Sequence, residues 1–184
     1  VNWTVFSSIC IVTIGLSALV ARRVGEKNPL QASEASQQGM WLALLLGIAI
    51  TIAGYILTPH LLTFMQAGEE AQCHAIPYLR IFFFSATFFT LYDTGCAAFR
   101  AAGNTRTPLI VGSSMILLNL LLDPLLIFGI GPFPELGVPG ASVATTISIF
   151  FACAMILYLL RRGRAGFPVE RLFALRPRIS EMLK

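Results

Sequence analysis

Long apolar stretches alternate with short polar breaks along the whole chain. A membrane-spanning helix needs roughly 20 consecutive, predominantly apolar residues. Five stretches meet or approach that length: 2–22, 38–65, 75–100, 107–130 and 138–161. The pattern predicts an all-α, polytopic bundle of about five transmembrane helices.

The breaks carry signals that begin and end helices. Before the second stretch, Asn28 can cap the helix, Pro29 suits its first position and Gln31 can complete a capping box. Before the fourth, we expect Thr107 to cap and Pro108 to begin the helix. The segment GIGPFPELGVPG is too rich in Gly and Pro to continue a helix.

Composition agrees with a membrane protein. Residues of the set AVILMFWYC make up 56% of the 184 positions, and charged residues only 12%. An ordinary soluble domain has about 25% charged residues. The composition excludes a soluble globule, and we expect a multi-pass protein of a prokaryotic plasma membrane.

Charge placement orients the bundle. Basic residues occupy every second break, and the breaks between them contain Glu69, Glu70 and Glu135 but no Lys or Arg. Lys and Arg concentrate in cytoplasmic loops, so the basic breaks are expected inside. The net charge of +4 then reflects topology, and we expect no nucleic-acid partner. Val1 falls near the outer face, which predicts one further helix before it.

Two segments are expected. Residues 1–162 form the transmembrane bundle. Residues 163–184 alternate Arg with apolar side chains, which is typical of a segment lying on the inner membrane surface. We expect this tail to lead toward further protein.

The stretch LLNLLLDPLLIFG places polar groups among leucines. A charge near the bilayer centre costs roughly 2.5–3.5 kcal/mol, and Asp123 lies about midway along the predicted fourth span. Asn119 is one helical turn away on the same face. Pro124 disfavours helical dihedrals at Asp123 and frees a backbone carbonyl. These oxygens could bind Na⁺, or the carboxylate could exchange a proton. The alternative is a structural aspartate hydrogen-bonded within the bundle.

The third stretch holds a second set of candidates. Asp93 lies toward its inner end, next to Tyr92, and could line a cavity or contact another helix. Asp93, Phe88 and Tyr92 are candidates for a substrate cleft, although aromatic residues on a spanning helix more often face lipid or the core. Arg80, near the outer end, can extend toward the interface.

Four segments, ALVARRVGEKNP, FRAAGNTRTPLIVG, NLLLDPLLIFGIG and ELGVPGASVAT, occur in an order that resembles the MATE (multidrug and toxic compound extrusion) transporters. VGEKNP and the short loops are similar to the DNA-damage-inducible-type branch. The resemblance covers nearly the whole chain. It implies the second to sixth helices of a six-helix N-terminal lobe, with the first helix and a C-terminal lobe outside this sequence.

The resemblance also implies a function. Family members export organic cations, drugs or other amphiphiles by alternating access, driven by Na⁺ or H⁺, and use no other cofactor. Their N-lobe ion site falls by motif on Asn119, Asp123 and Thr145. Its acidic partner on the first helix would precede Val1. Asp93 does not match the family pattern.

Two other functions were considered. A lipid-linked precursor flippase of the same superfamily would need a cationic cleft, and Arg80 is the only cation within a predicted span apart from the arginines at which spans end. An intramembrane aspartyl protease would carry Gly-x-Gly-Asp at its second aspartate, where this chain has LLLDP. We therefore expect a transporter and no catalytic residues.

Overall fold

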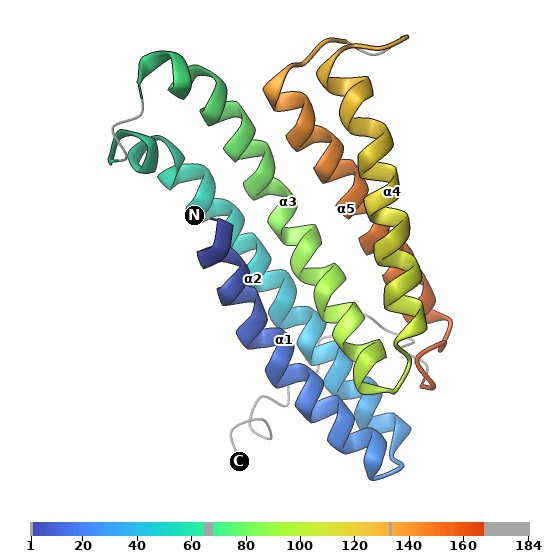
Figure 1. Cartoon of the computed structure of the whole chain (residues 1–184). Helices are drawn as coiled ribbons and strands as arrows, with labels where there is room; N and C mark the ends of the chain where they lie inside the picture. Colours follow the sequence, from blue (N-terminus) through green and yellow to red (C-terminus); the bar gives the residue numbers. More distant parts are fainter. Residues whose placement is uncertain (1, 65–67, 133, 168–184) are drawn as a thin grey trace.

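A computed structural model describes residues 2–64, 68–132 and 134–167, with the side chains of 2–12, 69–71 and 74 left undescribed. The described chain forms five helices joined by short connections (Figure 1). They are α1 (Asn2–Gly25), α2 (Pro29–Phe64), α3 (Glu69–Ala101), α4 (Arg106–Ile127) and α5 (Val138–Arg161). This confirms the predicted all-α bundle. Of the tail expected at 163–184, only 163–167 belong to the described part.

Four of these helices, α2 to α5, are long and apolar enough to cross a membrane, judged on the described residues. The other expected span, 2–22, coincides with α1, and its crossing of the membrane stays a prediction. The α1–α2 and α3–α4 turns and the end of α5 lie at one end of the bundle, with the remaining two connections at the other (Figure 1). The fold thus gathers the basic breaks at one end, as the inner-face interpretation requires.

Helix ends follow local chemistry. The side-chain oxygen of Asn28 accepts a hydrogen bond from the Gln31 N–H (3.2 Å) and caps α2, as predicted. The cap predicted at Thr107 is wrong, because α4 begins earlier. There the Asn104 side-chain oxygen accepts a hydrogen bond from the Thr107 N–H (3.1 Å). An asparagine two residues before the helix can therefore accept from the unpaired N–H groups of the first turn, as a residue at the N-cap position would.

The five helices pack most closely in their inner halves. The buried apolar cluster draws on the C-terminal halves of α1, α3 and α5 and the N-terminal halves of α2 and α4. Its largest fully buried side chains include Phe99, Met40 and Ile156. The core is therefore concentrated toward the inner end of the bundle.

Helix α3 occupies the centre and packs against α2 and α5, whereas α4 packs mainly on α5. Small residues allow these close approaches. Gly47 faces α3 so closely that a Cβ would lie 2.7 Å from the Thr87 Cα. On α5, a stripe of small residues four positions apart is buried: Gly140, Ala144, Ser148 and Ala152.

Candidate functional site

The structure brings the three residues of the predicted ion site together between α4 and α5. Asn119 and Asp123 lie on α4, and Thr145 lies on α5. The Asn119 side-chain amide (Nδ2) donates hydrogen bonds to Asp123 Oδ1 (3.3 Å) and to Thr145 Oγ1 (3.3 Å). Asn119 is thus the central member of a polar cluster that bridges the two helices.

Local geometry explains why these residues meet. Positions four apart on a helix are neighbours on one face, which places Asn119 beside Asp123. Gly140 permits α5 to approach α4, because a Cβ there would lie 2.5 Å from the Leu126 carbonyl oxygen. Thr145 follows one to two turns later on α5, and its hydroxyl also donates to the Ala141 carbonyl (2.9 Å). The close contact at Gly140 therefore sets the distance between α4 and α5 that the Asn119 amide bridges.

Asp123 lies nearer the outer end of α4 than the sequence suggested. The midway placement is wrong, because α4 ends at Ile127 rather than at 130. At about 1.5 Å per residue, Asp123 is roughly 6 Å along the axis from the last helical residue. Helix α4 continues through Pro124 for three more residues, so the proline lies in the last turn. The cluster therefore belongs to the outer, less tightly packed half of the bundle.

The partners of Asp123 are electrically neutral. Its side chain is half-buried, and no ion pair involves it within the described part of the chain. Carboxylate, hydroxyl and amide oxygens are the donors that hard cations prefer. This arrangement could hold a small cation or a proton.

Asp93 has a different environment. Its Oδ2 accepts a hydrogen bond from the Thr13 hydroxyl of α1 (2.9 Å), and its Oδ1 is 3.4 Å from Nη2 of Arg100. Sequence reasoning missed both partners. Arg100 could have been found, because residues seven apart share a helix face. Thr13 could not, because its contact depends on how α1 packs against α3. Asp93 thus makes the interhelical contact that was one of its two predicted roles.

The two aromatic candidates lie in helix contacts of α3. Phe88 packs edge-on against Phe150 of α5, with ring centroids 5.2 Å apart. Tyr92 approaches α4, where a Cβ on Gly112 would lie 3.1 Å from its hydroxyl oxygen. Both side chains are partly buried against the core. Their role in substrate binding stays a prediction.

Arg80 is held over an aromatic ring. The guanidinium carbon of Arg80 lies 4.6 Å from the ring centroid of Tyr55 on α2. Such a cation–π contact stabilises a cation at membrane depth. The described residues thus place one stacked arginine between α2 and α3, whereas a pyrophosphate-carrying flippase would need a cluster of cations.

Long apolar helices packed into one bundle define a class of protein, the polytopic helical membrane proteins. The MatE family model matches residues 1–125, which is more than half of the chain. The chain belongs to the MATE family.

Relatives of known name agree with this assignment. The chain is 33% identical over 176 residues to an FAD transporter of Shewanella oneidensis, covering 92% of this chain and 39% of the relative. It is 29% identical over 160 residues to the probable multidrug resistance protein NorM of Thermotoga maritima, covering 87% and 34%. The chain therefore spans less than half the length of these relatives.

Solved structures give the same result. The chain matches an inward-facing multidrug resistance MATE family transporter with a TM-score of 0.85 at 26% identity, over 97% of this chain and 40% of the other. It matches an outward-facing structure with a TM-score of 0.84 at 27% identity, over 98% and 39%. The family consists of multi-pass membrane transporters, and its bacterial members indicate the plasma membrane. This excludes the aspartyl protease interpretation.

Proposed function

We propose that the chain forms part of a secondary active transporter that exports organic cations, drugs or other amphiphilic small molecules in exchange for Na⁺ or H⁺. The names of its relatives support export of small molecules. The observation that carries the ion-coupling proposal is the Asn119–Asp123–Thr145 cluster, with its uncompensated carboxylate. Substrate and ion would bind alternately as the transporter switches between its inward-open and outward-open states.

The amide of Asn119 is the proposed moving part of the ion site. In the present arrangement its NH₂ group donates to the two oxygens that a cation would need. A bound Na⁺ requires oxygens, and a protonated Asp123 requires an acceptor. In both cases the side-chain amide of Asn119 flips, so that it presents Oδ1 instead of Nδ2. Loading of the site by either ion thus breaks the existing bond from Asn119 to Thr145 and loosens α4 from α5.

The energy available matches a conformational bias. An uncompensated charge in a membrane costs up to roughly 2.5–3.5 kcal/mol at the bilayer centre and less toward the interface. A tenfold change in the ratio of two conformations requires about 1.4 kcal/mol. Neutralising Asp123 with an ion favours one conformation by the amount that the cost of its charge differs between the two conformations, and a difference of about 1.4 kcal/mol gives a tenfold change.

The similarity to two transport states supports rigid-body motion. The chain resembles the inward-facing and outward-facing structures almost equally, with TM-scores of 0.85 and 0.84. A unit that keeps its internal structure between states can move as one body against a partner lobe. We place that partner lobe, and an acidic helix that completes the ion site, in protein outside this sequence.

The test uses Asp123→Asn in the complete transporter, reconstituted into vesicles with an imposed Na⁺ or H⁺ gradient. We expect the variant to fold but to lose ion-driven efflux, because an asparagine of nearly the same shape cannot carry the neutralisable charge. Asp93→Asn is the matched control, since its carboxylate is already paired with Arg100, and it should retain efflux. Undiminished efflux by Asp123→Asn would remove this carboxylate from the mechanism.

A further inference from the structure

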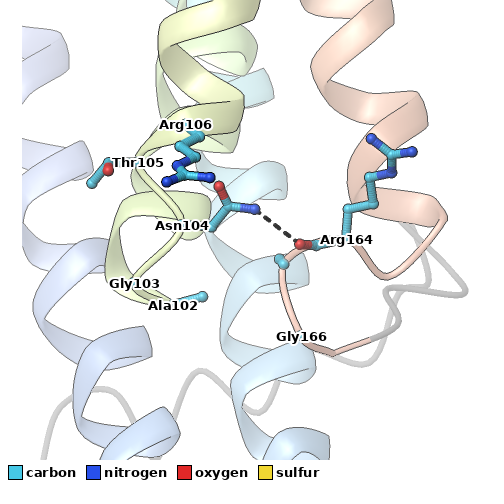
Figure 2. Close-up of a pocket in the computed structure, with 8 residues that line it drawn as sticks. Ala102, Gly103, Asn104, Thr105, Arg106, Arg164 and Gly166 are labelled. Carbon is cyan, nitrogen blue, oxygen red and sulfur yellow. Dashed lines mark hydrogen bonds between the residues drawn. The ribbon is translucent and has the colours of Figure 1, made fainter.

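The inner end of the bundle carries a hollow of about 390 Å³ between the α3–α4 turn and the segment that follows α5 (Figure 2). It lies at the basic end, far along α4 from the Asp123 cluster. The residues lining it come from two loops: Ala102, Gly103, Asn104, Thr105, Arg106, Arg164, Ala165 and Gly166. Two segments about 60 residues apart thus form one concave surface.

Asn104 fixes the two walls relative to each other. Its side-chain oxygen accepts the Thr107 N–H (3.1 Å), and its side-chain nitrogen donates to the Arg164 carbonyl (3.1 Å) (Figure 2). Gly103 and Gly166 adopt positive φ values of 81° and 90°, which bulkier residues rarely tolerate. The hollow is therefore formed by defined turns with a direct bond between them.

The charge of the hollow is positive and uncompensated. Arg106 and Arg164 line it, and no acidic residue does. Within the described ranges neither arginine forms an ion pair. Other arginines of this face are engaged. Hydrogen bonds from Arg22 and Arg23 hold the pKa of Glu26 below its usual value, and Arg162 stacks on Tyr158.

The position of the hollow determines which anion reaches it. It lies where α4 begins and α5 has ended, at the level of the inner membrane surface in the orientation derived above. Anionic phospholipids are concentrated there, and basic pockets at the cytoplasmic ends of transmembrane helices bind their headgroups. Guanidinium groups match the oxygens of a phosphate in paired hydrogen bonds. Arg106 and Arg164 supply one such group from each of the two loops that line the hollow.

We propose that this hollow binds the phosphate of an anionic phospholipid of the inner leaflet, with Arg106 and Arg164 contacting its oxygens. The bound headgroup ties the α3–α4 turn to the end of α5, adding to the single bond made by Asn104. The proposal depends on the membrane orientation and not on the ion-coupling mechanism. Lipid bound there stabilises the inner end of the bundle.

The test measures lipid binding by the complete protein in detergent, using short-chain phosphatidylglycerol, phosphatidylcholine and inorganic phosphate as separate probes. We expect phosphatidylglycerol to bind, and the double variant Arg106→Gln/Arg164→Gln to lose affinity at least about tenfold, as expected for two charged hydrogen-bonding groups. Arg161→Gln is the matched control, since Arg161 is also exposed at this face but does not line the hollow. It should change affinity less than about twofold.

Three results would overturn the proposal. One is equal phosphatidylglycerol affinity in the double variant and the control. Another is equally tight binding of phosphatidylcholine, which would mean that net negative charge is not recognised. The third is equally tight binding of inorganic phosphate, which would make the ligand a soluble anion. If the glutamine variant does not fold, Arg106→Lys/Arg164→Lys keeps the charge but removes the paired geometry. It should bind severalfold more weakly, and unchanged affinity would again reject the site.

Discussion

Asp93 and Asp123 are both half-buried carboxylates on membrane-length helices, but their surroundings differ. Asp93 lies toward the closely packed inner half of the bundle, between the Thr13 hydroxyl and the Arg100 guanidinium. Asp123 lies in the outer half and receives only a neutral amide from Asn119 among the described residues. Among the described residues, the first carboxylate is paired with a cation and the second is not. We therefore expect the second to gain more energy from an arriving ion.

The comparison separates two uses of an acidic residue in a membrane. A carboxylate paired with an arginine has its charge balanced within the bundle and contributes to helix packing. A carboxylate with neutral partners leaves its charge available for a cation that reaches it, which is what the proposed ion site requires. Burial alone does not distinguish the two, because both side chains are partly exposed. The identity of the partner does.

The largest expected effect comes from disrupting the helix packing beside the Asp123 cluster. Gly140→Val places side-chain carbon against the Leu126 carbonyl of α4. Overpacking of this kind costs about 1–3 kcal/mol, and it separates Thr145 from Asn119. Gly15→Val is the control near Asp93, because no atom lies within 4 Å of a Cβ at that position. Thermal unfolding in detergent should show a clear loss of stability for Gly140→Val and little loss for Gly15→Val. The reverse order would contradict the close approach of α4 and α5.

Removal of single partners tests the cluster more finely. Asn119→Ala and Thr145→Val each delete one oxygen donor, and a lost hydrogen bond or ligand of this type is worth about 1 kcal/mol. We expect each variant to raise the ion concentration for half-maximal transport by roughly fivefold. Thr146→Val is the matched control, because its hydroxyl bonds only within α5, to the Ser142 carbonyl. A similar effect for Thr145→Val and Thr146→Val would argue against a role for Thr145 as a ligand.

The smallest effect concerns the paired carboxylate. Arg100→Gln removes the cation from Asp93, and a partly exposed ion pair 3.4 Å apart is worth about 1 kcal/mol or less. A modest fall in unfolding temperature is expected, with efflux retained. A double-mutant cycle with Asp93→Asn should assign most of that loss to the pair. Abolished efflux in Arg100→Gln would mean that Asp93 is not merely structural.

The spans and the Asn119–Asp123 pair could be predicted from sequence because each depends on short-range pattern, whereas Thr145 was predicted only from the family resemblance. The lengths of the apolar stretches predicted the majority of the ends of α2 to α5 to within a few residues. The four-residue spacing of Asn119 and Asp123 predicted their contact, which the structure confirms. Both features follow from helix geometry alone.

The depth of Asp123 and the partners of Asp93 could not be obtained in the same way. The apolar run continues past Ile127, so hydrophobicity did not mark the end of α4. The end is instead set by the chain turning at Gly129, whose φ is +65°. The bond from Thr13 to Asp93 joins residues 80 apart and depends on tertiary packing. Local pattern carries little information about either.

The one-sided attachment of α4 has a consequence for how this protein could be controlled. Helix α4 leans mainly on α5, makes little contact with α3, and has no substantial contact with α1 or α2 among the described residues. Within the described bundle, a force that separates α4 from α5 therefore displaces α4 without disturbing the packing of α1, α2 and α3 against one another. A small molecule inserted between α4 and α5 would then move Asn119 away from Thr145 without touching the carboxylate itself.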